Sequence, residues 1–168
     1  MNKIFINAGH TLESKGTGAI GYLSESLETR KVANALAIYL RRVGKNVHHA
    51  TINKSSNYLK DVCDYVNRIG DKNDLFISIH FNSFNKKARG SEVYTWNAEP
   101  NNSINKELSK LGFKDRGIKK GNHLYVIKHT KMKAILVEVC FIDNKEDTEL
   151  YKKVGVEEIA KAIARGII

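Results

Sequence analysis

Proline is nearly absent from this sequence, which has a single one, Pro100, among its 168 residues. A proline-rich linker between domains is therefore excluded. There is also no internal repeat and no low-complexity segment. Because a chain of this length can form a complete core by itself, we expect one domain that spans residues 1–168.

Long apolar runs are missing too. No run approaches the roughly 18 residues that a membrane-spanning helix needs. The N-terminal "MNKIFINAGH" starts directly with a strand-like run, which is too short for the apolar region of a signal peptide and has no cleavage site. We therefore expect the chain to be made in the cytoplasm and not to span a membrane.

Cysteine is also scarce, with only Cys63 and Cys140. Both stand among apolar residues, and neither belongs to a Cys-x-x-Cys pair or another metal-binding spacing. This pattern favours two reduced thiols in the core. A disulfide and a catalytic thiol are the less favoured alternatives.

Positive charge is abundant, since 28 lysines and arginines against 18 acidic residues give a net charge of +10. Such an excess predicts attraction to a polyanion, which could be nucleic acid, an anionic membrane or an anionic cell wall. The alternative is that the lysines only keep the protein soluble. Nucleic acid is disfavoured because no RRM, KH or helix-turn-helix pattern and no set of base-stacking aromatic residues is present.

Strand-like and helix-like segments alternate along the chain. We expect strands at residues 3–8, 46–52, 74–80, 91–96, 123–128 and 134–139, and helices at residues 25–43, 57–69, 102–111, 145–152 and 156–167. Alternation of this kind, with continuously apolar strands, is typical of a sheet covered on both faces. The sequence therefore predicts a single α/β domain with a mixed, largely parallel sheet of about six strands and helices on both faces.

Two of the expected strands end on a histidine, "IFINAGH" on His10 and "LFISIH" on His80. Open α/β sheets bind their ligands at the carboxyl ends of strands. If these strands are parallel neighbours, both imidazoles reach the same edge, where Gly9 would let the backbone turn sharply. Taken singly, either histidine is as readily a structural residue with satisfied hydrogen bonds.

The helix expected at 25–43 has a glutamate on its apolar face. With about 100° of rotation per residue, an inward stripe centred on Leu36 contains Val32, Leu40 and Val43. Glu25 falls on the same stripe, whereas Glu28 falls on its flank. A carboxylate on an apolar stripe must be paired or coordinated. The alternative, a carboxylate favoured by the helix dipole, suits Glu28 better than Glu25.

A further glutamate, Glu138, lies within the apolar run "AILVEVCFIDN". Such a residue is costly unless it has a function or a partner. An apolar pocket raises the pKa of a carboxyl group, which suits a general acid or base. A buried salt bridge to one of the lysines is equally compatible with the sequence.

Together, His10, His80 and Glu25 form a His₂Glu set, which with an open fourth position is a ligand pattern of catalytic zinc. One Zn²⁺ would polarise a carbonyl and lower the pKa of bound water, while Glu138 moves the proton. The set predicts a hydrolase that acts on amides. Asn82 follows His80 by two residues and would orient the substrate or hold a ligand.

The other histidines fit a metal site less well. His48 and His49 are adjacent on a strand and therefore face opposite sides, so they cannot easily bind one metal. His123 and His129 flank the expected strand "LYVI" and are expected on the surface. In "DNKED", Asn144 is expected to cap a helix rather than to bind a metal.

Several motifs, in order along nearly the whole chain, resemble those of zinc-dependent N-acetylmuramoyl-L-alanine amidases, the catalytic domains of phage endolysins and bacterial cell-wall hydrolases. "INAGH" is similar to the opening strand of that family. "SESLETRKVANALAIYLRRVGKNV" is similar to its glutamate-led helix, in which the distance to Gly-x-x-Val selects Glu25. "DLFISIHFNS", "ARGSEVY", "RGIK", "LYVI" and "ILVEVCFIDNKED" resemble its later segments.

This resemblance implies that His10, Glu25 and His80 are zinc ligands and that Glu138 is the catalytic carboxylate. It also implies the substrate, which is the amide between N-acetylmuramic acid and L-alanine in peptidoglycan. One small departure is Thr29, where the family often has asparagine.

We therefore expect a peptidoglycan amidase with one Zn²⁺ per chain, whose basic loops contact an acidic peptide stem or an anionic wall polymer. Two alternatives are a zinc exopeptidase of related architecture and a basic polyanion-binding module. Because no export signal is seen while the implied substrate lies outside the membrane, we expect release onto the cell wall during phage lysis.

Overall fold

The computed structural model of the chain describes residues 2–13, 16–98 and 103–168. In these residues the strands are β1 (Lys3–Ala8), β2 (Asn46–His49), β3 (Leu75–Asn82), β4 (Ser91–Thr95), β5 (Asp115–Lys120) and β6 (Lys133–Phe141). The helices are α1 (Glu25–Arg42), α2 (Tyr58–Ile69), α3 (Ile104–Lys110), α4 (Tyr125–His129), α5 (Lys145–Val154) and α6 (Val156–Arg165). Pro100 lies outside the described residues.

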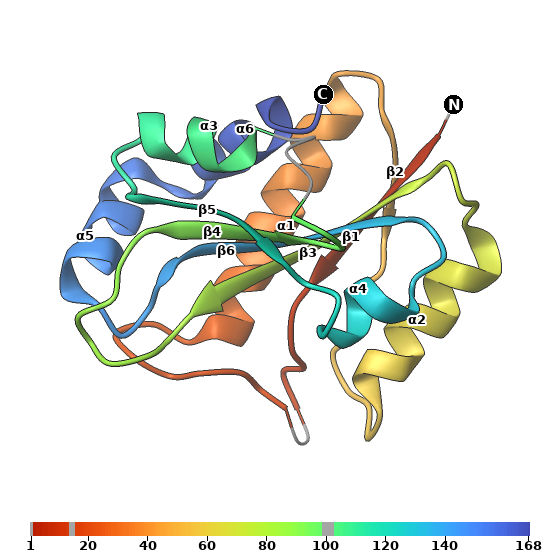
Figure 1. Cartoon of the computed structure of the whole chain (residues 1–168), viewed down its shortest axis with the longest axis horizontal. Helices are drawn as coiled ribbons and strands as arrows, with labels where there is room; N and C mark the ends of the chain where they lie inside the picture. The colour runs from red at the N-terminus through yellow and green to blue at the C-terminus, as the bar shows by residue number, and fades with distance from the viewer. Residues whose placement is uncertain (1, 14–15, 99–102) are drawn as a thin grey trace.

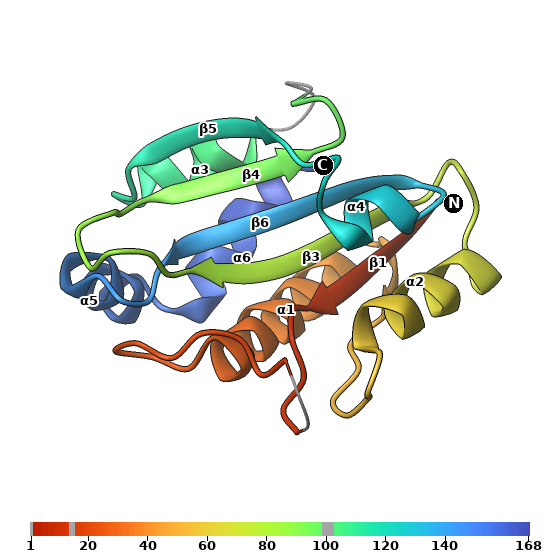
Figure 2. The ribbon, with the colours of Figure 1, turned by 60° about the horizontal axis from the view of Figure 1, so that its bottom comes forward.

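The strands form one mixed sheet in the order β2-β1-β3-β6-β4-β5, most of which can be followed in Figure 2. Neighbouring strands are parallel except for β4 and β6, which are antiparallel. The two longest strands, β3 and β6, lie at the centre, as expected for the most apolar segments. The predicted α/β fold with a mixed, largely parallel sheet of six strands is confirmed.

Helices cover both faces of this sheet (Figure 1). The side chains of β1 show that each face of the sheet has its own core, because successive residues of a strand point to opposite faces. Ile4 and Ile6 belong to a core shared with α1, α3 and α6, whereas Phe5 belongs to a second core shared with α2 and α4. The predicted arrangement with helices on both faces is therefore confirmed.

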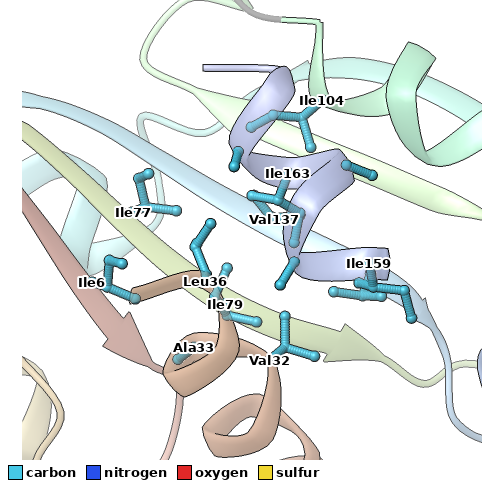
Figure 3. Packing of buried hydrophobic residues seen from close by; sticks show 14 of the residues in the cluster. Ile6, Val32, Ala33, Leu36, Ile77, Ile79, Ile104, Val137, Ile159 and Ile163 are labelled. Carbon is cyan, nitrogen blue, oxygen red and sulfur yellow. The ribbon is translucent and has the colours of Figure 1, made fainter. Parts of the chain in front are cut away.

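The larger core fixes the position of α1 (Figure 3). Val32 and Leu36, one turn apart on this helix, are fully buried in the same cluster as Ile6 and Ile79 of the sheet. Burying a side chain such as Leu36 contributes about 1.5–3 kcal/mol to folding. As a result, α1 is held with its first residue, Glu25, close to the carboxyl ends of β1 and β3.

One predicted strand is wrong. Residues 123–128 do not form a strand, and Tyr125–His129 forms the short helix α4 instead. Its neighbouring residues Val126 and Ile127 are both buried, which suits one face of a helix better than the alternation of a half-buried strand. The missing strand is β5, whose mostly polar sequence "DRGIKK" at the sheet edge has no apolar run to reveal it.

The end of α1 also differs from the prediction. Val43 is 44% exposed and follows the last helical residue, so it does not belong to the inward stripe. The two cysteines are free and buried, as their apolar surroundings predict. Within the described residues, no helix has both the length and the apolar character needed to cross a membrane.

Candidate metal centre

The parallel pairing of β1 and β3 brings the two strand-end histidines together. The two strands are in register from Ile4 and Leu75 to Ala8 and Ile79, and the Gly9 amide continues the ladder by donating to the Ile79 carbonyl at 2.8 Å. The imidazole rings of His10 and His80 then lie edge to face, with centroids 4.9 Å apart. Figure 2 shows β1, β3 and β6 pointing toward the same edge of the sheet.

Small residues make this close approach possible. A Cβ atom added to Gly9 would lie 2.3 Å from the His80 ring, and one added to Gly18 would lie 2.8 Å from both the Glu25 carboxylate and the His10 ring. No side chain can be accommodated at such distances without displacing a ring or the carboxylate. His10 itself has a left-handed backbone, with φ of 66°, which turns its side chain toward the other two residues.

Glu25 completes the group from the first turn of α1. Its Oε1 atom lies 3.0 Å from His10 Nε2 and 3.1 Å from His80 Nδ1. Backbone amides of Ala19 and Phe81 also donate to the carboxylate, at 2.9 Å and 3.2 Å. One ligand atom from each of the three residues lies within 4.8 Å of the others, a cluster that could hold a metal ion.

The electrostatics of Glu25 and His80 suit a cation. Burial opposes ionisation of Glu25, yet hydrogen bonds and charge from His10 and His80 outweigh it and hold its pKa well below the ordinary value. Burial lowers the pKa of His80 despite the neighbouring carboxylate, which favours a neutral imidazole. An ionised carboxylate and a neutral imidazole are the forms in which these groups bind metals.

Two residues that the sequence did not single out as ligands hold the His10 turn in place. The Thr29 hydroxyl donates to the Gly9 carbonyl at 3.1 Å, and Arg30 Nη2 donates to the His10 carbonyl at 2.9 Å. Arg30 also reaches the Ser26 carbonyl at 2.8 Å, so one guanidinium ties α1 to the turn. In the sequence, Thr29 stands out only as a departure from a family pattern, and nothing points to Arg30.

Glu138 faces the group from the neighbouring strand. It is the register partner of His80 in the pairing of β3 with β6, so both side chains lie on the same face. Its Oε2 atom is buried and has no hydrogen-bond partner among the described residues. Burial, followed by the charges of Glu25 and Glu92, raises its pKa well above the ordinary value.

The alternative role of Glu138, a buried salt bridge to lysine, is not seen in the described part of the chain. The charge of Lys119 lowers the pKa of Glu138, but burial and the nearby carboxylates Glu25 and Glu92 have larger effects and raise it. Lys119 itself pairs with Glu92.

Asn82 lies at the end of β3, beyond an irregularity in the ladder after His80. Its Nδ2 atom donates to Glu92 Oε1 at 2.7 Å, and its Oδ1 atom accepts from the Ser83 amide at 2.8 Å. A further site residue, not predicted from the sequence, is Glu92, which is buried on β4 and directly opposite Glu138 in the pairing of β4 with β6. A glutamate near the start of the strand-like "SEVYTW" was the available signal.

The remaining polar candidates lie outside the group. His123 and His129 are exposed, as predicted, and neither His48 nor His49 belongs to a three-residue metal cluster in the described residues. The Asn144 side chain accepts from the Asp147 amide at 3.1 Å, which confirms the predicted helix cap.

Glu28 lies in the first turn of α1, in agreement with the helix-start role considered for it, and it has partners of its own. The residue is buried, and its carboxylate accepts hydrogen bonds from the Tyr151 hydroxyl and the Lys31 ammonium, both at 2.8 Å. Glu28 therefore joins α1 to α5 and takes no part in the His10–Glu25–His80 group.

The fold agrees with a comparison to protein families. The sequence pattern of the N-acetylmuramoyl-L-alanine amidase family matches residues 4–168. The chain belongs to this family.

Individual relatives are similar to the chain over nearly its whole length. An uncharacterised protein of Clostridium perfringens is 37% identical over 98% of this chain, and the endolysin of Bacillus phage SPP1 is 29% identical over 98%. The chain spans about half the length of the first relative (51%) and 64% of the second. The catalytic domain of the CD27L endolysin, which targets Clostridia difficile, is 33% identical, with a TM-score of 0.87 over 99% of this chain and 97% of that domain.

Proposed function

We propose that the chain hydrolyses the amide bond between N-acetylmuramic acid and L-alanine in peptidoglycan, with His10, Glu25 and His80 as the ligands of one Zn²⁺ and Glu138 as the general acid and base. The observation that supports this most strongly is the meeting of a His₂Glu cluster with Glu138, whose buried Oε2 atom has no hydrogen-bond partner among the described residues, in an amidase-family fold. A buried polar atom without a partner is uncommon in proteins and points to a function.

The three residues fit a zinc ion by their chemistry. Two imidazole nitrogens and one carboxylate oxygen converge from three separate segments, and two glycines leave the room for them. His₂Glu with an open position is a catalytic zinc ligand set. When bound, zinc would supply Lewis acidity toward the scissile carbonyl and lower the pKa of a coordinated water.

Glu138 would accept and then donate the proton that the reaction transfers. In its ionised form it takes the proton from the attacking water, and it then returns that proton to the nitrogen of the departing L-alanine. Its raised pKa makes the protonated form, which donates to the leaving nitrogen, more accessible than in an ordinary carboxyl group. Asn82 retains one N–H group beyond its bond to Glu92, and we assign that group to contact with the substrate.

The experiment distinguishes the three metal ligands from Glu138, the residue proposed to transfer the proton. Replacing His10, Glu25 or His80 with alanine should remove both zinc and activity. Glu138→Gln should keep zinc and fold but lose at least about 10²–10⁴-fold in rate, which is the usual contribution of general acid–base catalysis. Zinc is measured by mass spectrometry, and activity by the release of peptide stems from purified cell walls.

Glu28→Gln is a matched control. It makes the same substitution at a buried glutamate of α1, the helix that provides Glu25, but Glu28 lies outside the His10–Glu25–His80 group. It should keep zinc and activity. A folded, zinc-loaded and fully active Glu138→Gln protein would refute the proposed mechanism. Release of peptide stems from intact walls also separates this function from that of a zinc exopeptidase, which would need a free peptide end.

We also propose that the chain acts at the cell wall after release during phage lysis, and that anionic wall polymers attract it. The phage endolysin among its relatives supports the first point, and the net charge of +10 supports the second.

A further inference from the structure

A second polar cluster lies next to Glu138 on the same face of the sheet. Its centre is Glu92 of β4, which is 2% exposed. Four donors share its two carboxylate oxygens: Oε1 accepts from Asn82 at 2.7 Å and from the Tyr94 hydroxyl at 3.0 Å, while Oε2 accepts from Arg116 Nε at 2.7 Å and from the Lys119 ammonium.

An irregularity in β5 brings the two cations together. Between Ser91 and Val93 of β4 the ladder advances two residues, while the paired residues of β5 advance three, from Asp115 to Ile118. Arg116 and Lys119 would point to opposite faces of a regular strand, because they are three residues apart. The extra residue puts both on the face of Glu92, and Gly117 provides the left-handed backbone there, with φ of 82°.

The cluster has an excess of positive charge that its own members do not neutralise. Two cations share one carboxylate, and both remain within reach of solvent, since the Arg116 and Lys119 side chains are 28% and 36% exposed. Among the described residues, the terminal Nη1 and Nη2 groups of Arg116 have no hydrogen-bond partner, and the guanidinium lies over the Phe141 ring, 4.9 Å from its centroid. A fixed guanidinium with free terminal N–H groups is suited to a carboxylate.

The position of the cluster determines which part of a substrate it would meet. His80, Glu138 and Glu92 are successive register partners across β3, β6 and β4, so the cations lie beyond Glu138 as seen from the His10–Glu25–His80 group. In the proposed function Glu138 returns a proton to the nitrogen of the departing peptide. The peptide side of the scissile bond therefore points toward β4 and β5.

We propose that Arg116 and Lys119 form a carboxylate-binding subsite, held in place by Glu92, that selects muramoyl peptides with a free carboxylate on the peptide stem. This inference rests on the proposed function and adds to it a preference within the substrate class. Glu92 is a positioning residue, while Arg116 and Lys119 determine specificity.

The test compares two soluble muramoyl peptides that differ in one group, a free stem carboxylate or the corresponding amide. The wild-type protein should cleave the free-carboxylate peptide with a KM lower by about tenfold or more, as expected for hydrogen bonds to a charged group. The kcat should change little, because this contact is made equally before and during the reaction.

Arg116→Gln and Lys119→Gln should each raise the KM for the free-carboxylate peptide and leave that for the amide nearly unchanged. Lys120→Gln is the matched control: it removes the same charge from the next residue of β5, which is exposed and points to the opposite face. It should preserve the wild-type preference. Compared with Arg116→Gln, Arg116→Lys should recover part of the preference for the free-carboxylate peptide. It restores the positive charge but not the planar guanidinium that can donate two hydrogen bonds to one carboxylate.

The possible outcomes distinguish a failure of the proposed subsite from a failure of the proposed amidase function. A wild-type protein that cleaves both peptides with the same KM overturns the subsite and leaves the amidase function standing. Equal losses on both peptides in the Gln variants also overturn it, because they indicate a structural role. A wild-type protein that cleaves neither peptide and releases no stems from cell walls refutes the proposed function instead. The wild-type comparison remains decisive even if a variant does not fold.

Discussion

At the scale of single residues, Glu138 makes the stability of the chain depend on pH. Its pKa is raised in the folded state, so the folded protein keeps a proton that the unfolded chain releases above about pH 4.5. Stability from this residue is therefore complete at low pH and is lost as the pH rises toward the folded-state pKa.

Glu138→Gln removes this dependence. The free energy of unfolding of the variant, relative to wild type, should increase from pH 5 to pH 8, by up to about 1.4 kcal/mol for each pH unit inside the affected interval. Urea unfolding of both proteins after treatment with a chelator measures it. A variant that is less stable than wild type, by about 3–5 kcal/mol, would instead indicate a broken buried ion pair.

The sequence indicated some site residues far better than others. His10, His80, Glu25 and Glu138 could be selected because each is a polar residue where an apolar strand or helix face leads us to expect none. Arg30 gives no such signal, since its importance lies in bonds to the backbone carbonyls of Ser26 and His10. Contacts of that kind depend on where the chain folds back, which a residue pattern does not encode.

At the scale of elements, the irregular strand β5 depends on Gly117. A Cβ atom there would meet no other atom within 4 Å, so only the left-handed backbone opposes a larger residue. Gly117→Ala should lower the free energy of unfolding by about 1–2 kcal/mol, the cost of that conformation for an L-residue. Gly117→Asn should cost less, because asparagine adopts this conformation more readily.

Urea unfolding of the two variants provides the measurement. If the alanine variant is as stable as the asparagine variant, the left-handed backbone of Gly117 is not required for the extra residue of β5.

The same elements show why strand prediction succeeded at the centre of the sheet and failed at its edge. β3 and β6 are buried on both faces, so their residues must be almost continuously apolar. β5 pairs on one side only, with β4, and its polar side chains serve Glu92 instead of a core. The helix α4 is short, and its apolar residues pack against β6 and α2. In the sequence it is therefore a short apolar run, which resembles that of a strand.

At the scale of the whole molecule, a positive net charge coexists with glutamates that gather at the site. The chain has a net charge of +10, yet Glu25, Glu92 and Glu138 gather on one region of the sheet. Glu25 and Glu92 are buried and hydrogen-bonded to neighbouring groups, whereas most of the described lysines are exposed. A partner that approaches from a distance therefore meets a positive surface, and this surface would favour encounter with an anionic wall.

This charge predicts salt-dependent wall binding. Glu138→Gln is a suitable protein for the measurement because it should bind the wall without degrading it. Its affinity for cell walls that retain their anionic polymers should fall by about tenfold or more between low salt and roughly 0.5 M NaCl, where charges are screened within a few ångströms. Walls stripped of those polymers should bind it more weakly and with little dependence on salt. Cosedimentation with both preparations provides the comparison, and affinity for intact walls that is unchanged by salt would show that the excess lysines serve a purpose other than attraction to the wall.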